Sequence, residues 1–234
     1  SVTSEGIVTN TLGTSNFVAG VNAGNSITSG GNYNVAVGDE AGTAITTGDN
    51  NTFVGYTAGD ATTTAGNNTA VGYKALTANT TGNENTSLGF QALRDSTTAT
   101  GNTAVGMNSL ALNTTGGDNV AVGRDALISN TTASNNTAVG KSALTSNTTG
   151  ASNSALGQNA LAANTTGTGN TASGKDALDA NTTGDYNVGL GYLALSSNTT
   201  ADDNTAVGTS ALTANTTGAN NTAVGRKALL TNST

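Results

Sequence analysis

The 234-residue chain contains no cysteine, histidine, tryptophan or proline, and aromatic and charged residues make up only 3% and 9% of it. Without histidine and cysteine, it lacks the commonest general base, the thiol nucleophile and every zinc site built on these residues. It also has no disulfide framework. We therefore expect no catalytic residues, no metal site and no cofactor, and we do not expect an enzyme.

Positive charge is scarce as well. The net charge is −7, and only seven residues are lysine or arginine. Nucleic-acid binding and adhesion to an anionic membrane both need a basic surface, so neither partner is expected. No apolar run approaches the roughly 18 residues of a membrane span, so membrane insertion is not expected either. Disordered chains are usually charged or rich in proline, and this chain is neither.

What the chain does contain is a 17-residue repeat with the consensus N-T-A-V-G-x-x-A-L-x-x-N-T-T-G-x-x. Positions 1 to 17 are counted from its first asparagine. Glycine is invariant at position 5, and position 9 is leucine except for Gly42 and Gly59 in the first two copies. We assign residues 34–234 to twelve repeats, and residues 1–33, with a degenerate copy at Asn16, to an N-terminal cap or joint segment. The twelve first positions are Asn34, Asn51, Asn68, Asn85, Asn102, Asn119, Asn136, Asn153, Asn170, Asn187, Asn204 and Asn221.

A repeat this short excludes helical hairpins, whose units exceed about 30 residues, and it is poor in helix formers. N-T-A-V-G is typical of a short strand, A-L of a second one, and N-T-T-G of a turn. The sequence therefore predicts an all-β fold, a parallel β-solenoid or β-roll of about twelve coils. Equivalent residues of successive coils then form ladders with a spacing of about 4.8 Å.

These ladders suggest what the core contains. We expect a valine ladder (Val37, Val54 and Val71, then Leu88) and a leucine ladder to build it, and asparagines at position 12 to bond from coil to coil. Such a core is thin for the conformational entropy that folding must overcome. The alanine face of the strand is therefore expected to pack between chains, which favours a homotrimer. A monomeric solenoid held by its ladder hydrogen bonds is the alternative.

The stretch Thr69-Ala70-Val71-Gly72-Tyr73-Lys74-Ala75, repeated with small changes in all twelve copies, resembles the head repeats of YadA-type trimeric autotransporter adhesins. Repeats similar to N-T-A-[VI]-G-Y-x-A-L-x-x-N-T-T-G also occur in phage tail-fibre-like and bacterial surface fibre proteins. The resemblance implies a left-handed β-roll of three chains that presents an adhesive surface. The present unit is a few residues longer than the typical head repeat.

Two groups of residues are candidate sites. Tyr56, Tyr73, Phe90, Tyr192, Arg226 and Lys227 occupy variable positions and are candidates for ligand contact. The second group consists of Asn-x-Ser/Thr sequons in the turn, which would make the protein a glycoprotein. The alternative is that asparagine and threonine are simply good turn and ladder residues. The candidate glycosylation sites are Asn79, Asn113, Asn130, Asn147, Asn164, Asn181, Asn198 and Asn215.

The sequence as a whole favours an extracellular structural protein, located outside the cell or on a cell or virion surface. We expect a rigid fibre or filament subunit with an adhesive role. Its partners would be further copies of itself, joined as a homo-oligomer or head to tail, and a cell-surface or glycan receptor. The alternative is an ice-binding solenoid that uses threonine ladders, although Val120 and Val188 interrupt the strand threonines.

Overall fold

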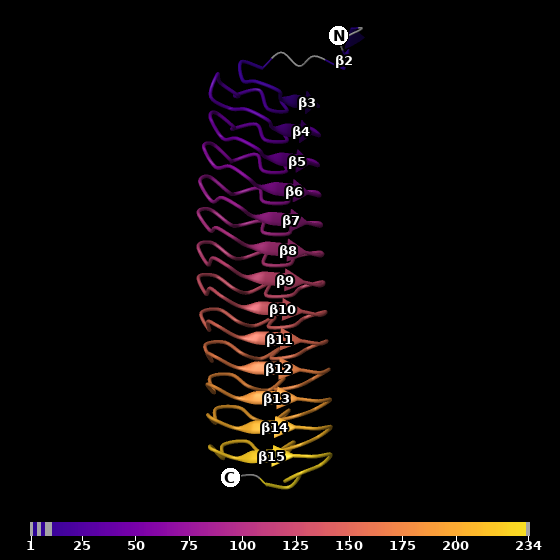
Figure 1. Ribbon diagram of the computed structural model, residues 1–234, viewed down its shortest axis with the longest axis vertical. Helices are drawn as coiled ribbons and strands as arrows, with labels where there is room; N and C mark the ends of the chain where they lie inside the picture. Colours follow the sequence, from indigo (N-terminus) through magenta and orange to yellow (C-terminus); the bar gives the residue numbers. More distant parts are fainter. Residues whose placement is uncertain (1, 4–5, 8–10, 233–234) are drawn as a thin grey trace.

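The computed structural model describes residues 2–3, 6–7 and 11–232. The chain winds into a stack of coils, and each coil adds one strand directly below the last (Figure 1). No helix occurs among the described residues. Near the N-terminus β1 (Val2–Thr3) pairs antiparallel with β2 (Gly6–Ile7). The main strands are β3 (Phe17–Ala19), β4 (Val35–Val37), β5 (Thr52–Val54), β6 (Thr69–Val71), β7 (Thr86–Leu88), β8 (Thr103–Val105), β9 (Val120–Val122), β10 (Thr137–Val139), β11 (Ser154–Leu156), β12 (Thr171–Ser173), β13 (Val188–Leu190), β14 (Thr205–Val207) and β15 (Thr222–Val224).

β3 to β15 form one 13-stranded parallel sheet in sequence order. From β4 onward each residue pairs with the residue 17 positions later, as Thr137 does with Ser154. The predicted parallel β-solenoid is therefore confirmed. The predicted second strand is not, because A-L lies in a turn. Coil-to-coil bonding nevertheless continues there: the amide of Leu127 donates to the Ala143 carbonyl (3.0 Å).

The sheet begins one coil before the twelve regular repeats, because β3 pairs with β4 at an offset of 18 residues. The extra residue lies in the turn around Gly30. Before it, the Thr28 amide bonds to the Thr46 carbonyl, 18 residues later, and after it the Asn32 amide bonds to Asp49, 17 residues later. Residues 16–33 are thus a coil of the solenoid. The rest of the predicted cap falls partly outside the described residues.

The two faces of each strand are reversed from our expectation. In β4 to β15 the middle residue is buried, as with Ala70 and Ala138, whereas Val71 is 38% and Leu156 55% exposed. The expected valine ladder therefore lies outside, and the strand alanines fill the interior of their own coil. The leucine ladder is in the core, as predicted. Since alternation along a strand is strict, the buried Asn at position 1 forces position 3 inward and positions 2 and 4 outward.

Asparagine at position 1 is buried because its amide bonds along the stack. Asn51 Nδ2 donates to Asn34 Oδ1 (3.1 Å) and to the Ala65 carbonyl (2.9 Å), and the Asn51 backbone amide donates to the same Asn34 Oδ1 (2.9 Å). This pattern recurs along the stack and satisfies groups that would be costly to bury unpaired. The second predicted ladder, at position 12, is confirmed from Asn113 to Asn215.

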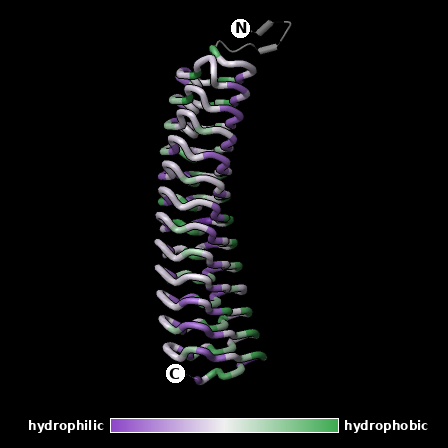
Figure 2. Tube along the Cα trace, turned by 60° about the vertical axis from the view of Figure 1, so that its left-hand side comes forward, coloured by the Kyte–Doolittle hydropathy of each residue, from purple (hydrophilic) through white to green (hydrophobic). Residues whose placement is uncertain are grey.

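At position 9 a leucine side chain fills the core in most coils, and where glycine stands there, other side chains fill the same space. Leu127 is fully buried with φ of 51°, and Gly42 and Gly59 have nearly the same φ, 56° and 59°. A Cβ on Gly59 would lie 2.6 Å from the ring of Phe53, which is itself fully buried. In the first two regular coils, then, Phe53 and Ile45 fill the space that leucine fills elsewhere. Figure 2 shows hydrophobic and hydrophilic segments recurring at the same places in successive coils.

Candidate contact surfaces

The outward side chains of the sheet form one continuous surface without charge. We call it the strand face: the residues at positions 2 and 4 in β4 to β15. All 24 of these side chains are threonine, valine, leucine or serine. The hydroxyls of its threonines make no hydrogen bond within the part of the chain that the structure describes. The sequence alone could have indicated this surface, because no repeat has a charged residue at position 2 or position 4.

A hollow of about 340 Å³ interrupts the strand face across β10, β11 and β12. It arises where Ser173 stands in place of the usual valine and Ser154 in place of threonine. Leu156 rises beside it and is 55% exposed. The strand face therefore has a recess and a projection side by side.

Three of the six residues predicted to contact a ligand form a stack at position 6, just after the strand. The Tyr56 and Tyr73 ring centroids lie 5.5 Å apart, and those of Tyr73 and Phe90 lie 5.1 Å apart, with nearly parallel planes. These rings are between 42% and 46% exposed. Because the rings face one another, they present mainly their edges to the solvent.

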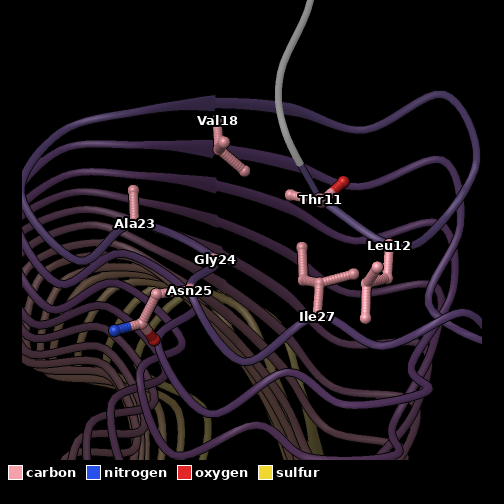
Figure 3. A pocket seen from close by; sticks show the side chains of 7 residues that line it. All are labelled: Thr11, Leu12, Val18, Ala23, Gly24, Asn25 and Ile27. Carbon is pink, nitrogen blue, oxygen red and sulfur yellow. The ribbon is translucent and has the colours of Figure 1, made fainter.

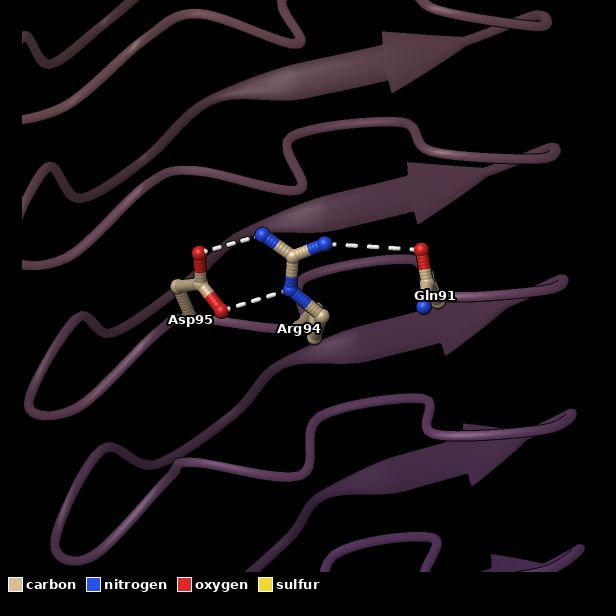
Figure 4. A network of polar contacts seen from close by, with 3 residues as sticks. All are labelled: Gln91, Arg94 and Asp95. Atoms are coloured by element: carbon tan, nitrogen blue, oxygen red, sulfur yellow. Dashed lines mark hydrogen bonds and ion pairs between the residues drawn. The ribbon is translucent and has the colours of Figure 1, made fainter.

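The other three predicted contact residues lie apart from the stack. The ammonium group of Lys175 lies over the ring of Tyr192 in a cation–π contact, with Nζ 5.5 Å from the ring centroid. Arg226 and Lys227 are exposed in the last coil. Arg94 sits elsewhere in its coil and is held by a bidentate pair with Asp95 (2.6 Å for each bond) and by Gln91 (3.4 Å) (Figure 4).

The eight candidate glycosylation asparagines are all fully buried. In Asn147 the amide nitrogen donates to Asn130 Oδ1 (2.9 Å) and to the Gly150 carbonyl (2.9 Å). A glycan would have to be joined to that nitrogen, which points into the coil and uses both of its hydrogens. The ladder interpretation therefore accounts for these residues in the folded protein without a glycan. The eight are Asn79, Asn113, Asn130, Asn147, Asn164, Asn181, Asn198 and Asn215.

The two threonines of the N-T-T-G turn differ. The hydroxyl at position 13 donates to the next coil, as Thr148 does to the Thr165 carbonyl (3.0 Å). At position 14 the threonines are exposed, and no hydroxyl hydrogen bond is found for them in residues 11–232. The members of this exposed column are Thr47, Thr64, Thr81, Thr98, Thr115, Thr132, Thr149, Thr166, Thr183, Thr200 and Thr217.

Acidic side chains do not gather into a site. Among the described residues, no group of three or more acidic side chains is placed to hold a metal ion. Burial raises the pKa of Asp60 and of Asp179, both at position 10, and each has one buried carboxylate oxygen without a hydrogen-bond partner. Threonine at this position donates to a carbonyl of the preceding coil, as Thr213 does to Leu193 (3.2 Å). A carboxylate cannot do so, which fits the raised pKa values.

The N-terminal end of the stack carries a second hollow, of about 310 Å³ (Figure 3). Leu12, Val18 and Ile27 form its apolar part, and Thr11 and Asn25 its polar rim. Gly24, at position 9, also lines it, and a Cβ there would lie 2.7 Å from Val18 and 2.9 Å from Ile27, so these two side chains occupy the space beside it. No titratable side chain lines it.

Comparison of the chain with family models, with curated proteins and with solved structures finds no match. The similarity to YadA-type head repeats therefore remains a resemblance of short motifs. None of the residues that the structure describes forms a helix long and apolar enough to span a bilayer.

Proposed function

We propose that this protein is an extracellular structural rod, a fibre or filament subunit that provides reach, rigidity and an adhesive surface. The observation that carries the proposal is the uninterrupted sheet of 13 parallel strands. With about 4.8 Å per coil, it makes a rod of about 60 Å.

The way the rod is held together supports this role. Backbone bonds, two asparagine ladders and a leucine ladder all run along the rod axis, so at each junction between coils a load along the rod is divided among many contacts. Adhesion would use side chains that the coil leaves outside, such as the aromatic stack of Tyr56, Tyr73 and Phe90. The trimer that the sequence favoured loses its main argument, because the alanines fill their own coil. A three-chain assembly therefore rests on the family resemblance alone.

Immunoelectron microscopy of the producing cells or particles tests the proposal. The expected result is label along fibres outside the cell or on the particle surface, together with short rods of the purified chain in negative stain. Label confined to the cell interior would contradict an extracellular role. Purified chains that scatter X-rays as compact spheres would contradict the rod.

Ice binding is the second candidate, and the strand face favours it. Threonine and valine stand outward in two parallel rows, with coils about 4.8 Å apart. Regular rows of hydroxyl and methyl groups can order water in a lattice-like array. The interruptions at Val120 and Val188 keep the methyl groups and remove only hydroxyls.

Thermal hysteresis decides this alternative. An ice-binding strand face predicts a freezing-point gap that Thr137→Arg, at the centre of the face, abolishes. Thr149→Arg, in the exposed turn column, is the matched control and should leave the gap unchanged. No hysteresis in the unaltered protein would reject ice binding, and loss only in the control variant would move the ice-binding surface to the turn.

A further inference from the structure

We propose that the strand face is covered by the strand face of a second copy, with the two rods parallel and related by a two-fold axis along their length. This inference deepens the proposed structural role by naming the partner of that face. It begins from the surface itself. A strip of valine, leucine, threonine and serine along 12 coils is unusual on a monomer, because exposed surfaces normally interleave charges.

The dimensions fit a two-copy interface. Three residues at about 3.3 Å each make a strip about 10 Å wide, and 12 coils at about 4.8 Å make it about 60 Å long. The flat area is therefore about 600 Å² per copy, and residues beside it add to this. The total for two copies reaches about 1,200 Å², the lower end of the range for specific, stable interfaces.

Charge beside the strip selects the orientation of the second copy. Positions 16 and 17, which lead into the strand, carry six acidic residues and no basic residue: Asp49, Glu84, Asp118, Asp185, Asp202 and Asp203. Positions 6 and 7, which follow the strand, carry six of the seven basic residues, Lys74, Arg124, Lys141, Lys175, Arg226 and Lys227, and four acidic ones, Asp39, Glu40, Asp125 and Asp176. The strand face thus has one edge with only acidic charges, the acidic edge, and an opposite edge, the basic edge, with an excess of two positive charges.

Rotation by 180° about an axis parallel to the rod brings the acidic edge of one copy opposite the basic edge of the other. Rotation about an axis across the rod instead places acidic against acidic, which like-charge repulsion opposes. The coil levels agree with the parallel choice. Asp118 and Arg124 flank the same strand, β9, while Asp185 and Lys175 flank the neighbouring strands β13 and β12.

Local ion pairs at the basic edge do not prevent this pairing. Arg124 and Asp125 lie 3.4 Å apart, and the Arg124 side chain is 50% exposed. Exposed ion pairs of this kind contribute little and can exchange partners. No salt bridge is found for Lys141 in the described part of the chain.

Shape is consistent with the same arrangement. In a parallel, in-register pair, position 4 of one copy faces position 2 of the other. Leu156, which projects from β11, then lies over Ser154 of the second copy, at the hollow of about 340 Å³. The unpaired threonine hydroxyls can bond to one another or to trapped water across such an interface.

Cross-linking of single-cysteine variants tests the orientation, because the natural chain has no cysteine. Val54→Cys in β5 and Val207→Cys in β14 place one thiol near each end of the strand face, about 43 Å apart. A bismaleimide with a reach of about 10 Å should couple two copies of each variant separately. Coupling only in a mixture of the two variants would mean antiparallel rods and would overturn the proposal.

Light scattering and Leu156→Lys complete the test. The unaltered chain should have the mass of a dimer at micromolar concentration. Leu156→Lys should raise the dimer dissociation constant at least tenfold, with unchanged circular dichroism because residue 156 lies outside the core. Thr149→Lys adds the same charge on the turn and should leave dissociation unchanged. A monomeric or trimeric mass for the unaltered chain would overturn the pairing while leaving the proposed rod to be judged by its own shape and location.

Discussion

At the scale of single residues, the backbone of one coil restricts which side chains the neighbouring coil can have at position 5. The glycine at position 5 has a φ between 124° and 141°, and in every coil before the last it also lies close to the following coil. A Cβ on Gly106 would lie 2.7 Å from the carbonyl oxygen of Gly123. Real side chains do not come this close to backbone atoms, so the invariance of this glycine follows from stacking as well as from φ.

Gly106→Ala should therefore destabilise the protein by about 2–4 kcal/mol, the sum of a backbone clash and an unfavourable φ. Gly225→Ala is the control: its φ is 124°, yet no atom lies within 4 Å of its added Cβ. It should cost only about 1–2 kcal/mol. Urea denaturation of both variants measures the difference, and equal losses would show that coil contact plays no part.

Asp179 predicts a dependence of stability on pH. Burial, and after it the charge of Asp176, raises the pKa of Asp179 above 3.8. A raised folded pKa means that the charged form opposes folding: the contribution of Asp179 is fully favourable below pH 3.8 and is lost as pH rises through the folded pKa. Asp179→Asn should therefore be more stable than the natural chain at pH 7.

The advantage of Asp179→Asn should shrink towards pH 3, where a protonated carboxyl can donate a hydrogen bond as the amide does. Denaturation at both pH values measures it. The exposed Asp203→Asn removes the same charge and should alter stability little. An advantage that stays constant between pH 7 and pH 3 would contradict burial of the charge as its source.

At the scale of elements, a three-residue strand is too short to persist alone, so each strand depends on the ladders beside it. The position-12 ladder is complete from Asn113 onward and stops at Ser96, whose buried hydroxyl has no partner. On the other side of the gap, Asn79 bonds only within its own turn. One residue thus separates Asn79 from the rest of the ladder.

Ser96→Asn should close this gap and stabilise the protein by about 1 kcal/mol, through new amide bonds to Asn79 and Asn113. Ser96→Ala removes the unpaired hydroxyl without adding a donor, and so serves as the control. Thermal unfolding of the two variants separates the effects. Equal melting temperatures for Asn and Ala at this position would mean that the ladder bonds add nothing.

At the scale of the whole molecule, each coil contacts only its neighbours, so the stack behaves as a one-dimensional array. Deleting residues 136–152 removes one complete repeat and joins Asn135 to Asn153, a junction equivalent to the natural one. We expect an intact rod that is shorter by about 4.8 Å. Deleting residues 136–151 instead leaves one coil a residue short, so the strand and asparagine ladders no longer align across that junction, and the melting temperature should fall below that of the 17-residue deletion. Small-angle scattering and circular dichroism distinguish these outcomes.

The sequence by itself determined the repeat, the parallel solenoid and the position-12 ladder, because identical side chains every 17 residues fit only a stack of identical coils. It did not determine which strand face is inside, since T-A-V alternates equally well either way. The tertiary structure decided that when it buried the position-1 amides against the preceding coil, as with Asn51 and Asn34. Alanine then fills the coil and valine faces outward. The outward orientation of the charge-free strand face follows from that choice, which depends on how coils close in space and not on any local pattern.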